Sequence, residues 1–242
     1  MPHRPHFEEL DWRETPMGEI SLRRRREPTS GIDVFEAKLG DEFLMSSLFT
    51  VAEIELARLG LAATDGTALD VLVGGLGLGY TAVAVLEDPR VRSLVVQEAL
   101  PEVIDWHRRE LLPVSAQLTA DDRVRLVQGD FFATVGAGHS ASDQRFHAVL
   151  VDIDHSPRHV LHPSHAAFYS AEGLARLGSC LHPGGVFGLW SDDPPDDDLM
   201  AALANVFSTT EAHVVKFDNF LTGGESANTV YVATVHASSE QG

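Results

Sequence analysis

The chain has 242 residues, 44% of them hydrophobic, so it can bury a sizeable core and is not expected to be disordered as a whole. Its formal net charge of −18 argues against a nucleic-acid partner, because phosphate backbones bind basic surfaces. The longest uncharged run, residues 71–86, is too short for a comfortable membrane span, and the polar N-terminus lacks a signal-peptide pattern. We therefore expect a cytoplasmic protein with no membrane partner.

The first 47 residues are strand-like and predict a small β-hairpin region. The segment "GEISLRRR" is followed by the turn "EPTSG" and then by "IDVFEAKLG", in which apolar residues alternate. The basic run Arg23–Arg26 lies on a predicted strand, so its side chains point to both faces. We expect these arginines at a solvated sheet edge or a subunit contact rather than at an anion site. Residues 1–47 are taken as this region and residues 48–242 as the main domain.

From residue 48 onward the pattern first becomes helical, in "SSLFTVAEIELARLGL", and then alternates short apolar runs with helical segments. Near-continuous apolar strands separated by helices indicate a mostly parallel sheet that is covered on both faces. The linker between the last two strands is too short for a crossover helix, which predicts an antiparallel pair at one edge. The predicted fold is α/β, a doubly wound, mostly parallel seven-stranded sheet of Rossmann-like type, with strands at Leu69–Val73, Ser93–Gln97, Val124–Val127, Ala148–Val151, Val186–Trp190, His213–Phe217 and Thr229–Val235.

A glycine-rich turn follows the first of these strands. Gly75, Gly77 and Gly79 allow tight turning and close approach to a ligand, and a helix that starts near Tyr80 points its free N–H groups at the same place. Ligands of doubly wound sheets bind at the carboxyl ends of the strands, where this turn lies. The turn alone is a weak signal, because it also satisfies a relaxed dinucleotide-binding pattern.

Two acids end the next two strands. Glu98 closes the second strand, where a carboxylate can accept hydrogen bonds from both hydroxyls of a ribose. Asp130 follows the third strand and could accept a hydrogen bond from an adenine amino group. Either acid alone could be a solvated turn residue, but acids at successive strand ends favour a nucleoside site.

The order of these motifs resembles the class I S-adenosylmethionine-dependent methyltransferase fold, and specifically its spermidine synthase-like branch. The resemblance rests on the glycine turn, "VVQEALPEVI", "VQGDFF", "FHAVLVDIDHSP" and "LHPGGVFGLW", and extends over nearly the whole chain. It implies a donor-binding loop at Gly75, Gly77 and Gly79, with Glu98 holding the ribose and Asp130 the adenine. It also implies S-adenosylmethionine or its decarboxylated form as cofactor, no metal, and a homodimer joined through the N-terminal hairpins.

Three departures from the aminopropyltransferase pattern bear on the reaction. Those enzymes typically carry an Asp in the glycine loop where this chain has Leu78, and its loss removes repulsion against the carboxylate of ordinary S-adenosylmethionine. After the fourth strand Asp152 is kept, but His155 replaces a second acid. The Tyr-His-Glu that commonly follows "DEF" is replaced by "LMSS", residues 44–47. The departures favour a methyl donor over polyamine synthesis.

The candidate catalytic residues are Asp152, Asp154 and His155, which would orient or deprotonate a small-molecule acceptor. A histidine is mostly neutral at cytoplasmic pH and can serve as a general base. Further histidines follow at positions 159, 162 and 165, but Pro157 and Pro163 interrupt any continuous helix. A metal site is therefore the weaker interpretation of this run.

Three functions follow from these observations. The first is a methyltransferase that uses S-adenosylmethionine, and the second is an aminopropyltransferase that uses the decarboxylated donor. The third is a non-catalytic protein that keeps the fold, because two family acids are replaced. A nicotinamide dehydrogenase fits less well, since the terminal strand pair and the "LHPGG" turn are typical of the methyltransferase arrangement.

Overall fold

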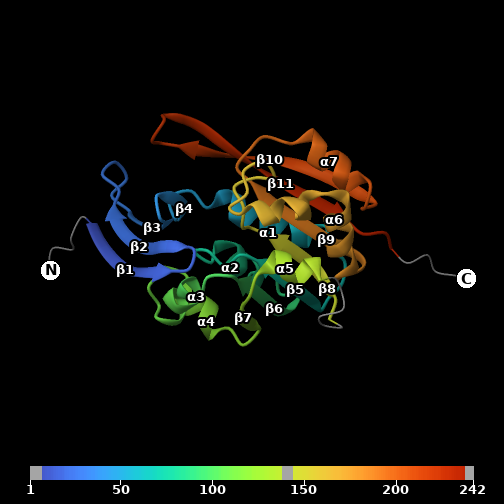
Figure 1. The fold of residues 1–242 in the computed structure, drawn as a ribbon, viewed down its shortest axis with the longest axis horizontal. Helices are drawn as coiled ribbons and strands as arrows, with labels where there is room; N and C mark the ends of the chain where they lie inside the picture. Colours follow the sequence, from blue (N-terminus) through green and yellow to red (C-terminus); the bar gives the residue numbers. More distant parts are fainter. Residues whose placement is uncertain (1–6, 138–143, 238–242) are drawn as a thin grey trace, which may run out of the picture.

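The computed structural model describes residues 7–137 and 144–237, so the outer limits of the two predicted regions, residues 1 and 242, lie outside the described residues. Within this part the chain forms two β-sheets that lie side by side (Figure 1). The division into two domains at residue 47 stays a prediction, as does a homodimer. None of the helices in the described ranges has both the length and the apolar character that crossing a membrane takes.

The smaller sheet is antiparallel and has the strand order β1-β2-β3-β4. Alternate side chains of its second strand point inward, and Ile20 and Leu22 are fully buried in the main core together with Ala37 of the third strand. Its hairpin pattern was predicted, and the structure adds a short fourth strand. The strands are β1 (Phe7–Thr15), β2 (Gly18–Arg26), β3 (Asp33–Leu39) and β4 (Glu42–Ser46).

The expectation that Arg23–Arg26 lie at a sheet edge was wrong. Strand β2 is an interior strand between β1 and β3. Arg23 and Arg25 both donate to the buried carboxylate of Glu36, at 2.7 and 2.8 Å. Acidic residues on the neighbouring strands therefore neutralise the arginines, and this pairing allows a basic run in the middle of a sheet.

The larger sheet has the order β10-β11-β9-β8-β5-β6-β7. Strands β5 to β9 pair in parallel, whereas β11 is antiparallel to both β9 and β10. This confirms the predicted mostly parallel sheet with a terminal hairpin at one edge. The strands are β5 (Leu69–Gly74), β6 (Val91–Glu98), β7 (Val124–Gln128), β8 (Phe146–Val151), β9 (Leu181–Ser191), β10 (Thr209–Asn219) and β11 (Gly224–Thr234).

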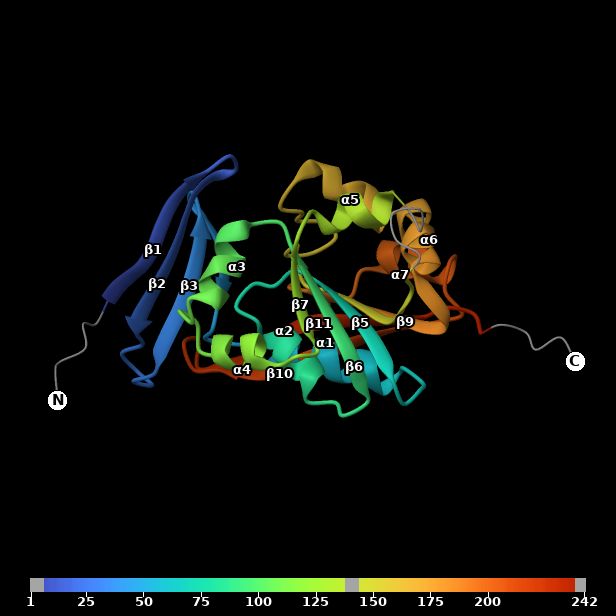
Figure 2. The same ribbon diagram turned by 90° about the horizontal axis from the view of Figure 1, so that it is seen from below.

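Helices cover both faces of this sheet (Figure 2). Alternate residues of one strand enter opposite cores: Val71 and Val73 of β5 pack with helices α1 to α4, and Leu72 packs with α5 to α7. The helices are α1 (Val51–Ala62), α2 (Tyr80–Leu86), α3 (Pro101–Arg108), α4 (Ser115–Ala120), α5 (Phe131–Gly136), α6 (Ala171–Ser179) and α7 (Asp197–Ala204), with a 3-10 helix η2 (Pro163–Tyr169).

The small sheet packs against helix α3 of the main sheet. The indole of Trp106 is fully buried, and its Nε1 donates to the Asp11 carboxylate at 2.7 Å. Arg109 donates to the other oxygen of Asp11 at 3.2 Å. These contacts join the small sheet to α3, and Met45 of strand β4 packs against Gly77 in the turn after β5, where the functional site is expected.

Candidate functional site

Two cavities meet at the carboxyl ends of the parallel strands. Cavity A, of about 420 Å³, is lined by Gly75, Gly77, Glu98 and Asp130 together with apolar side chains. Cavity B, of about 450 Å³, is lined by side chains of β4, α1, β9, β10 and β11. Gly77 and Asp152 line both cavities, so a ligand in cavity A would lie next to a ligand in cavity B.

The glycine turn has the backbone conformation that only glycine adopts readily. Gly75, Gly77 and Gly79 have φ angles of +92°, +47° and +92°. A Cβ on Gly75 would also lie 2.1 Å from the carbonyl oxygen of Asp152, so the turn packs directly against the end of β8. Helix α2 begins at Tyr80, as the sequence predicted.

Glu98 lies under the glycine turn at the end of β6. One carboxylate oxygen accepts the Leu76 N–H at 3.0 Å and the other accepts the Leu100 N–H at 2.9 Å. Burial raises the pKa of Glu98, and these N–H donors partly offset the effect. The backbone N–H groups of Gly77 and Ala99 also stabilise this carboxylate, which lines cavity A and can accept from the hydroxyls of a ligand there.

Asp130 lies at the rim of cavity A and is exposed to solvent. Its carboxylate accepts the Ala133 N–H at 3.1 Å and so caps helix α5. The neighbouring Phe131 and Phe132 also line the cavity. A flat base would therefore have apolar rings and a carboxylate at the same end, which fits a nucleoside whose ribose lies at Glu98.

His107 is a residue of this site that the sequence analysis missed. Its imidazole is fully buried behind the glycine turn, with Nε2 at 2.9 Å from the carbonyl oxygen of Gly77 and Nδ1 at 3.2 Å from the Ser115 hydroxyl. Because a carbonyl only accepts, Nε2 carries the hydrogen and Nδ1 accepts from Ser115. Burial lowers the pKa of His107, which favours this neutral form.

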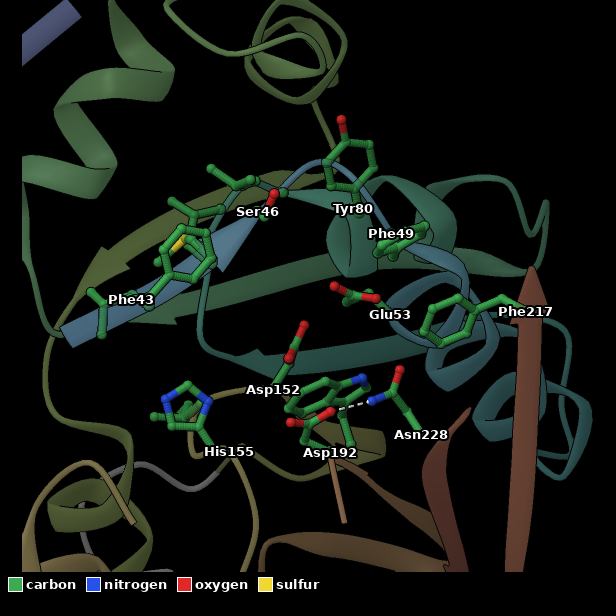
Figure 3. Close-up of a pocket in the computed structure, with 18 residues that line it drawn as sticks. Phe43, Ser46, Phe49, Glu53, Tyr80, Asp152, His155, Asp192, Phe217 and Asn228 are labelled. Carbon is green, nitrogen blue, oxygen red and sulfur yellow. Dashed lines mark hydrogen bonds between the residues drawn. The ribbon is translucent and has the colours of Figure 1, made fainter. Parts of the chain in front are cut away.

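Cavity B brings together three carboxylates from different parts of the chain: Glu53 of α1, Asp152 after β8 and Asp192 after β9. Figure 3 shows these three side chains directed toward a shared central space. Only Asp152 was a sequence prediction, because Glu53 and Asp192 belong to no motif. No lysine or arginine appears among the described residues that line this cavity.

The environment of Glu53 and Asp152 disfavours the charged forms of these two acids. Burial, aided by the neighbouring Asp152 and Asp192, raises the pKa of Glu53 to about 8. Burial also raises the pKa of Asp152 to about 6, against the effect of the Thr81 hydroxyl, which donates to it at 2.7 Å. A carboxylate with a pKa near 6 is a suitable proton acceptor near neutral pH.

Aromatic side chains form much of the remaining wall of cavity B. Phe43 comes from β4, Phe49 precedes α1, and Tyr80 begins α2. The ring centroid of Phe49 lies 5.3 Å from that of Phe217, near the end of β10 (Figure 3). The terminal hairpin thus contributes directly to the site, in addition to closing the sheet edge.

Leu78 and His155, which replace acids of the aminopropyltransferase pattern, both line cavity B. Leu78 is buried and faces cavity B, so the loop position where a carboxylate was expected is apolar. His155 also lines cavity B, and its Nε2 lies 3.5 Å from a carboxylate oxygen of Glu42. The structure thus brings His155 and Asp152 to one cavity.

Asp154 does not line either cavity but is buried beneath the segment that follows β8. Its carboxylate accepts hydrogen bonds from the Leu161 N–H at 2.7 Å, the Tyr169 hydroxyl at 2.8 Å and His165 Nδ1 at 2.8 Å. His165 in turn stacks on Phe132, with ring centroids 4.0 Å apart. Asp154 therefore has a structural role: it fixes the positions of Leu161 and His165, which line cavity A.

The histidines at 155, 159, 162 and 165 do not gather around a common point. The side chain of His159 lies near Asp193, and His162 caps η2 through the Ser164 N–H. Across residues 7–137 and 144–237, no three His, Cys, Asp or Glu side chains form a group that could hold a metal ion.

No protein-family model matches the sequence, and the comparison with curated proteins found no match. Among solved structures, the chain is similar to the spermidine synthase from Thermotoga maritima, with a TM-score of 0.71 and 18% identity over 93% of this chain and 72% of that one. A spermidine synthase in complex with the transition state analogue AdoDATO gives a TM-score of 0.70 and 18% identity over the same shares.

The human methyltransferase-like protein 13, in complex with SAH, gives a TM-score of 0.57 and 21% identity over 78% of this chain and 84% of that one. These similarities, all at 21% identity or less, confirm the predicted class I methyltransferase type of fold.

Proposed function

We propose that this protein is a transferase that binds S-adenosylmethionine in cavity A and transfers its methyl group to a small molecule in cavity B. The observation that carries the proposal is the junction of the two cavities at Gly77 and Asp152, next to the Glu98 carboxylate, which lines cavity A. The buried apolar side chain of Leu78 on the same loop supports the methyl donor.

A bound sulfonium donor supplies an electrophilic carbon, whose bond to sulfur breaks as a lone pair of the acceptor forms the new bond. The protein's part is positioning and proton removal, because such a displacement needs no covalent bond to the enzyme. Glu98 and the glycine turn hold the donor, and Asp152 takes the proton that the acceptor atom loses. His155 lines the same cavity and can relay that proton to solvent.

Aminopropyl transfer is the second candidate. It is favoured by the carboxylates of Glu53, Asp152 and Asp192, because the decarboxylated donor carries an ammonium group without a carboxylate. The solved spermidine synthases with a similar fold are consistent with it. S-Adenosylmethionine would instead bring its own carboxylate toward the acids of cavity B. Because Leu78 is apolar, it adds no further negative charge that would repel this carboxylate.

The deciding experiment measures the sulfur product. Purified protein is incubated with each donor and a mixture of small amines, and the products are identified by mass spectrometry. S-Adenosylhomocysteine from S-adenosylmethionine supports methyl transfer, whereas methylthioadenosine from the decarboxylated donor supports aminopropyl transfer and overturns our first choice. Calorimetric titration with both donors, using Glu98→Ala as control, runs in parallel. Binding without either product would support the non-catalytic interpretation.

A further inference from the structure

We infer that the acceptor is a monoamine with an aromatic or similarly bulky apolar body, whose ammonium end binds among Glu53, Asp152 and Asp192. The inference deepens the proposed function and rests on it, because it assigns cavity B to the acceptor. It names a substrate class that differs from the α,ω-diamines.

The first step of the argument is charge. Asp152 accepts a hydrogen bond from the neutral hydroxyl of Thr81, and Asp192 accepts one from the neutral amide of Asn228 at 2.7 Å. No lysine or arginine stands among the described residues of the lining. Carboxylates that lie together without a cation favour a ligand that brings one. The raised pKa of Glu53 is consistent with a cluster that lacks its counter-charge.

The second step is the distribution of charge along the cavity. The electrostatic effect of Asp152 and Asp192 on Glu53 places all three acids of the lining in one group. The rest of the described lining is aromatic, aliphatic or neutral polar, apart from His155. A second ammonium group on the aromatic side of the cavity would therefore have to lose its water without an anionic partner, because Glu42, the further acid beside His155, lines cavity A. One positive charge fits this cavity, and two do not.

The third step is the shape and chemistry of the wall. The ring centroids of Phe49 and Phe217 lie 5.3 Å apart, and these two rings border the acidic centre from one side (Figure 3). Tyr80 borders it from another, and Trp190 also lines the cavity. Aromatic rings stabilise both an ammonium group and a stacked ring. A cavity of about 450 Å³ has room for an aryl body beside the donor.

The test measures acceptor binding without turnover. The protein is first saturated with S-adenosylhomocysteine and then titrated with 2-phenylethylamine, 2-phenylethanol, butylamine and putrescine by calorimetry. We expect 2-phenylethylamine to bind about tenfold or more tightly than either putrescine or the uncharged alcohol. Butylamine should bind more weakly than 2-phenylethylamine, because it lacks the ring.

Two variants locate the ligand. Asp192→Asn should weaken binding of both monoamines by about tenfold, since it removes a charge without changing size. Phe217→Ala should weaken binding of 2-phenylethylamine and leave that of butylamine nearly unchanged. Asp218→Asn is the matched control, because Asp218 is exposed and does not line the cavity.

The outcomes separate the inference from the proposed function. Tighter binding of putrescine than of 2-phenylethylamine would overturn the inference that the acceptor is a monoamine. It would indicate a diamine acceptor and leave the transferase proposal intact. Equal binding of the alcohol and the amine overturns the requirement for a positive charge. Failure of the protein to bind S-adenosylhomocysteine, which is measured first, overturns the proposed function and the assignment of cavity B together.

Discussion

The hydroxyl of Thr81 donates a hydrogen bond to the carboxylate of Asp152 at 2.7 Å, which joins the first turn of α2 to the end of β8. The bond holds the proton acceptor of the proposed reaction against the donor loop. It also counteracts burial, which raises the pKa of Asp152 to about 6. Orientation and basicity of Asp152 therefore depend on the same contact.

Replacing Asp152 should separate proton transfer from donor binding. Asp152→Asn keeps the size of the side chain and can still accept from Thr81, but it cannot take a proton. We expect kcat to fall by about 10²- to 10⁴-fold while the Kd for S-adenosylhomocysteine changes little. Steady-state kinetics and calorimetry measure the two quantities, and an active Asp152→Asn variant would remove Asp152 from the proton pathway.

The pH profile should respond to Thr81. Asp152 accepts a proton only when ionised, so kcat should rise with pH through about 6. Thr81→Val removes the bond that lowers this pKa, and the rise should move to higher pH. Thr81→Ser, which keeps the hydroxyl, is the control that should leave the profile in place.

Asp154 should behave as a structural residue. Asp154→Asn would turn an amide toward groups that donate hydrogen bonds, among them the Leu161 N–H and the Tyr169 hydroxyl. We expect a loss of about 2 to 4 kcal/mol in the free energy of unfolding and weaker donor binding. Denaturant titration measures the first effect. A variant that loses only kcat, with stability unchanged, would restore Asp154 to the catalytic group.

Glu53 should make the protein less stable as the pH rises. Its pKa of about 8 lies above the ordinary value, so the folded state binds more protons than the unfolded state between about pH 4 and 8. Stability from this group is thus present at low pH and lost as pH rises through 8. Glu53→Gln should stabilise the protein at pH 8.5 by roughly 1 to 3 kcal/mol, since the side chain is half-buried and partly screened.

Thermal unfolding at pH 4.5 and pH 8.5 checks this prediction. The difference in Tm between Glu53→Gln and the parent protein should be several degrees at the higher pH and small at the lower one. Glu55→Gln, two residues further along α1 at a partly exposed position, is the matched control. An equal shift at both pH values would show that packing, and not charge, causes the effect.

Glu98 should control donor affinity. Glu98→Ala leaves the N–H groups of Leu76 and Leu100 without their carboxylate acceptor, and Glu98→Gln places an amide NH₂ against one of them. Both variants should bind S-adenosylhomocysteine about 10- to 100-fold more weakly. Calorimetry provides the measurement, and Glu110→Gln, on the exposed surface, should have no effect.

His107 should act as a positioning residue for the glycine turn. His107→Leu removes the donor to the Gly77 carbonyl, and we expect KM for the donor to rise several-fold with little change in KM for the acceptor. His107→Gln can donate from its amide and should restore part of the affinity. Equal losses for donor and acceptor would indicate general destabilisation instead.

Short-range patterns in the sequence were enough to predict the class of fold and the nucleoside half of the site. Alternation of apolar strands with helices is a local property, and so are the left-handed turn at Gly75 to Gly79 and the acid at the end of β6. Parallel strands bring their carboxyl ends to one edge, so residues at successive strand ends could be grouped before the structure was seen. The positions of Glu98 and Asp130 on cavity A follow from that rule.

The composition of cavity B, in contrast, depends on how distant segments of the chain pack together. Glu53 and Asp192 are far apart in the sequence, and they meet Asp152 because α1, β8 and β9 pack together. Asp152 and Asp154 look equivalent in the sequence, yet one faces the cavities and the other is buried under η2. Such differences depend on long-range packing and the path of the backbone after β8, which short sequence patterns do not encode.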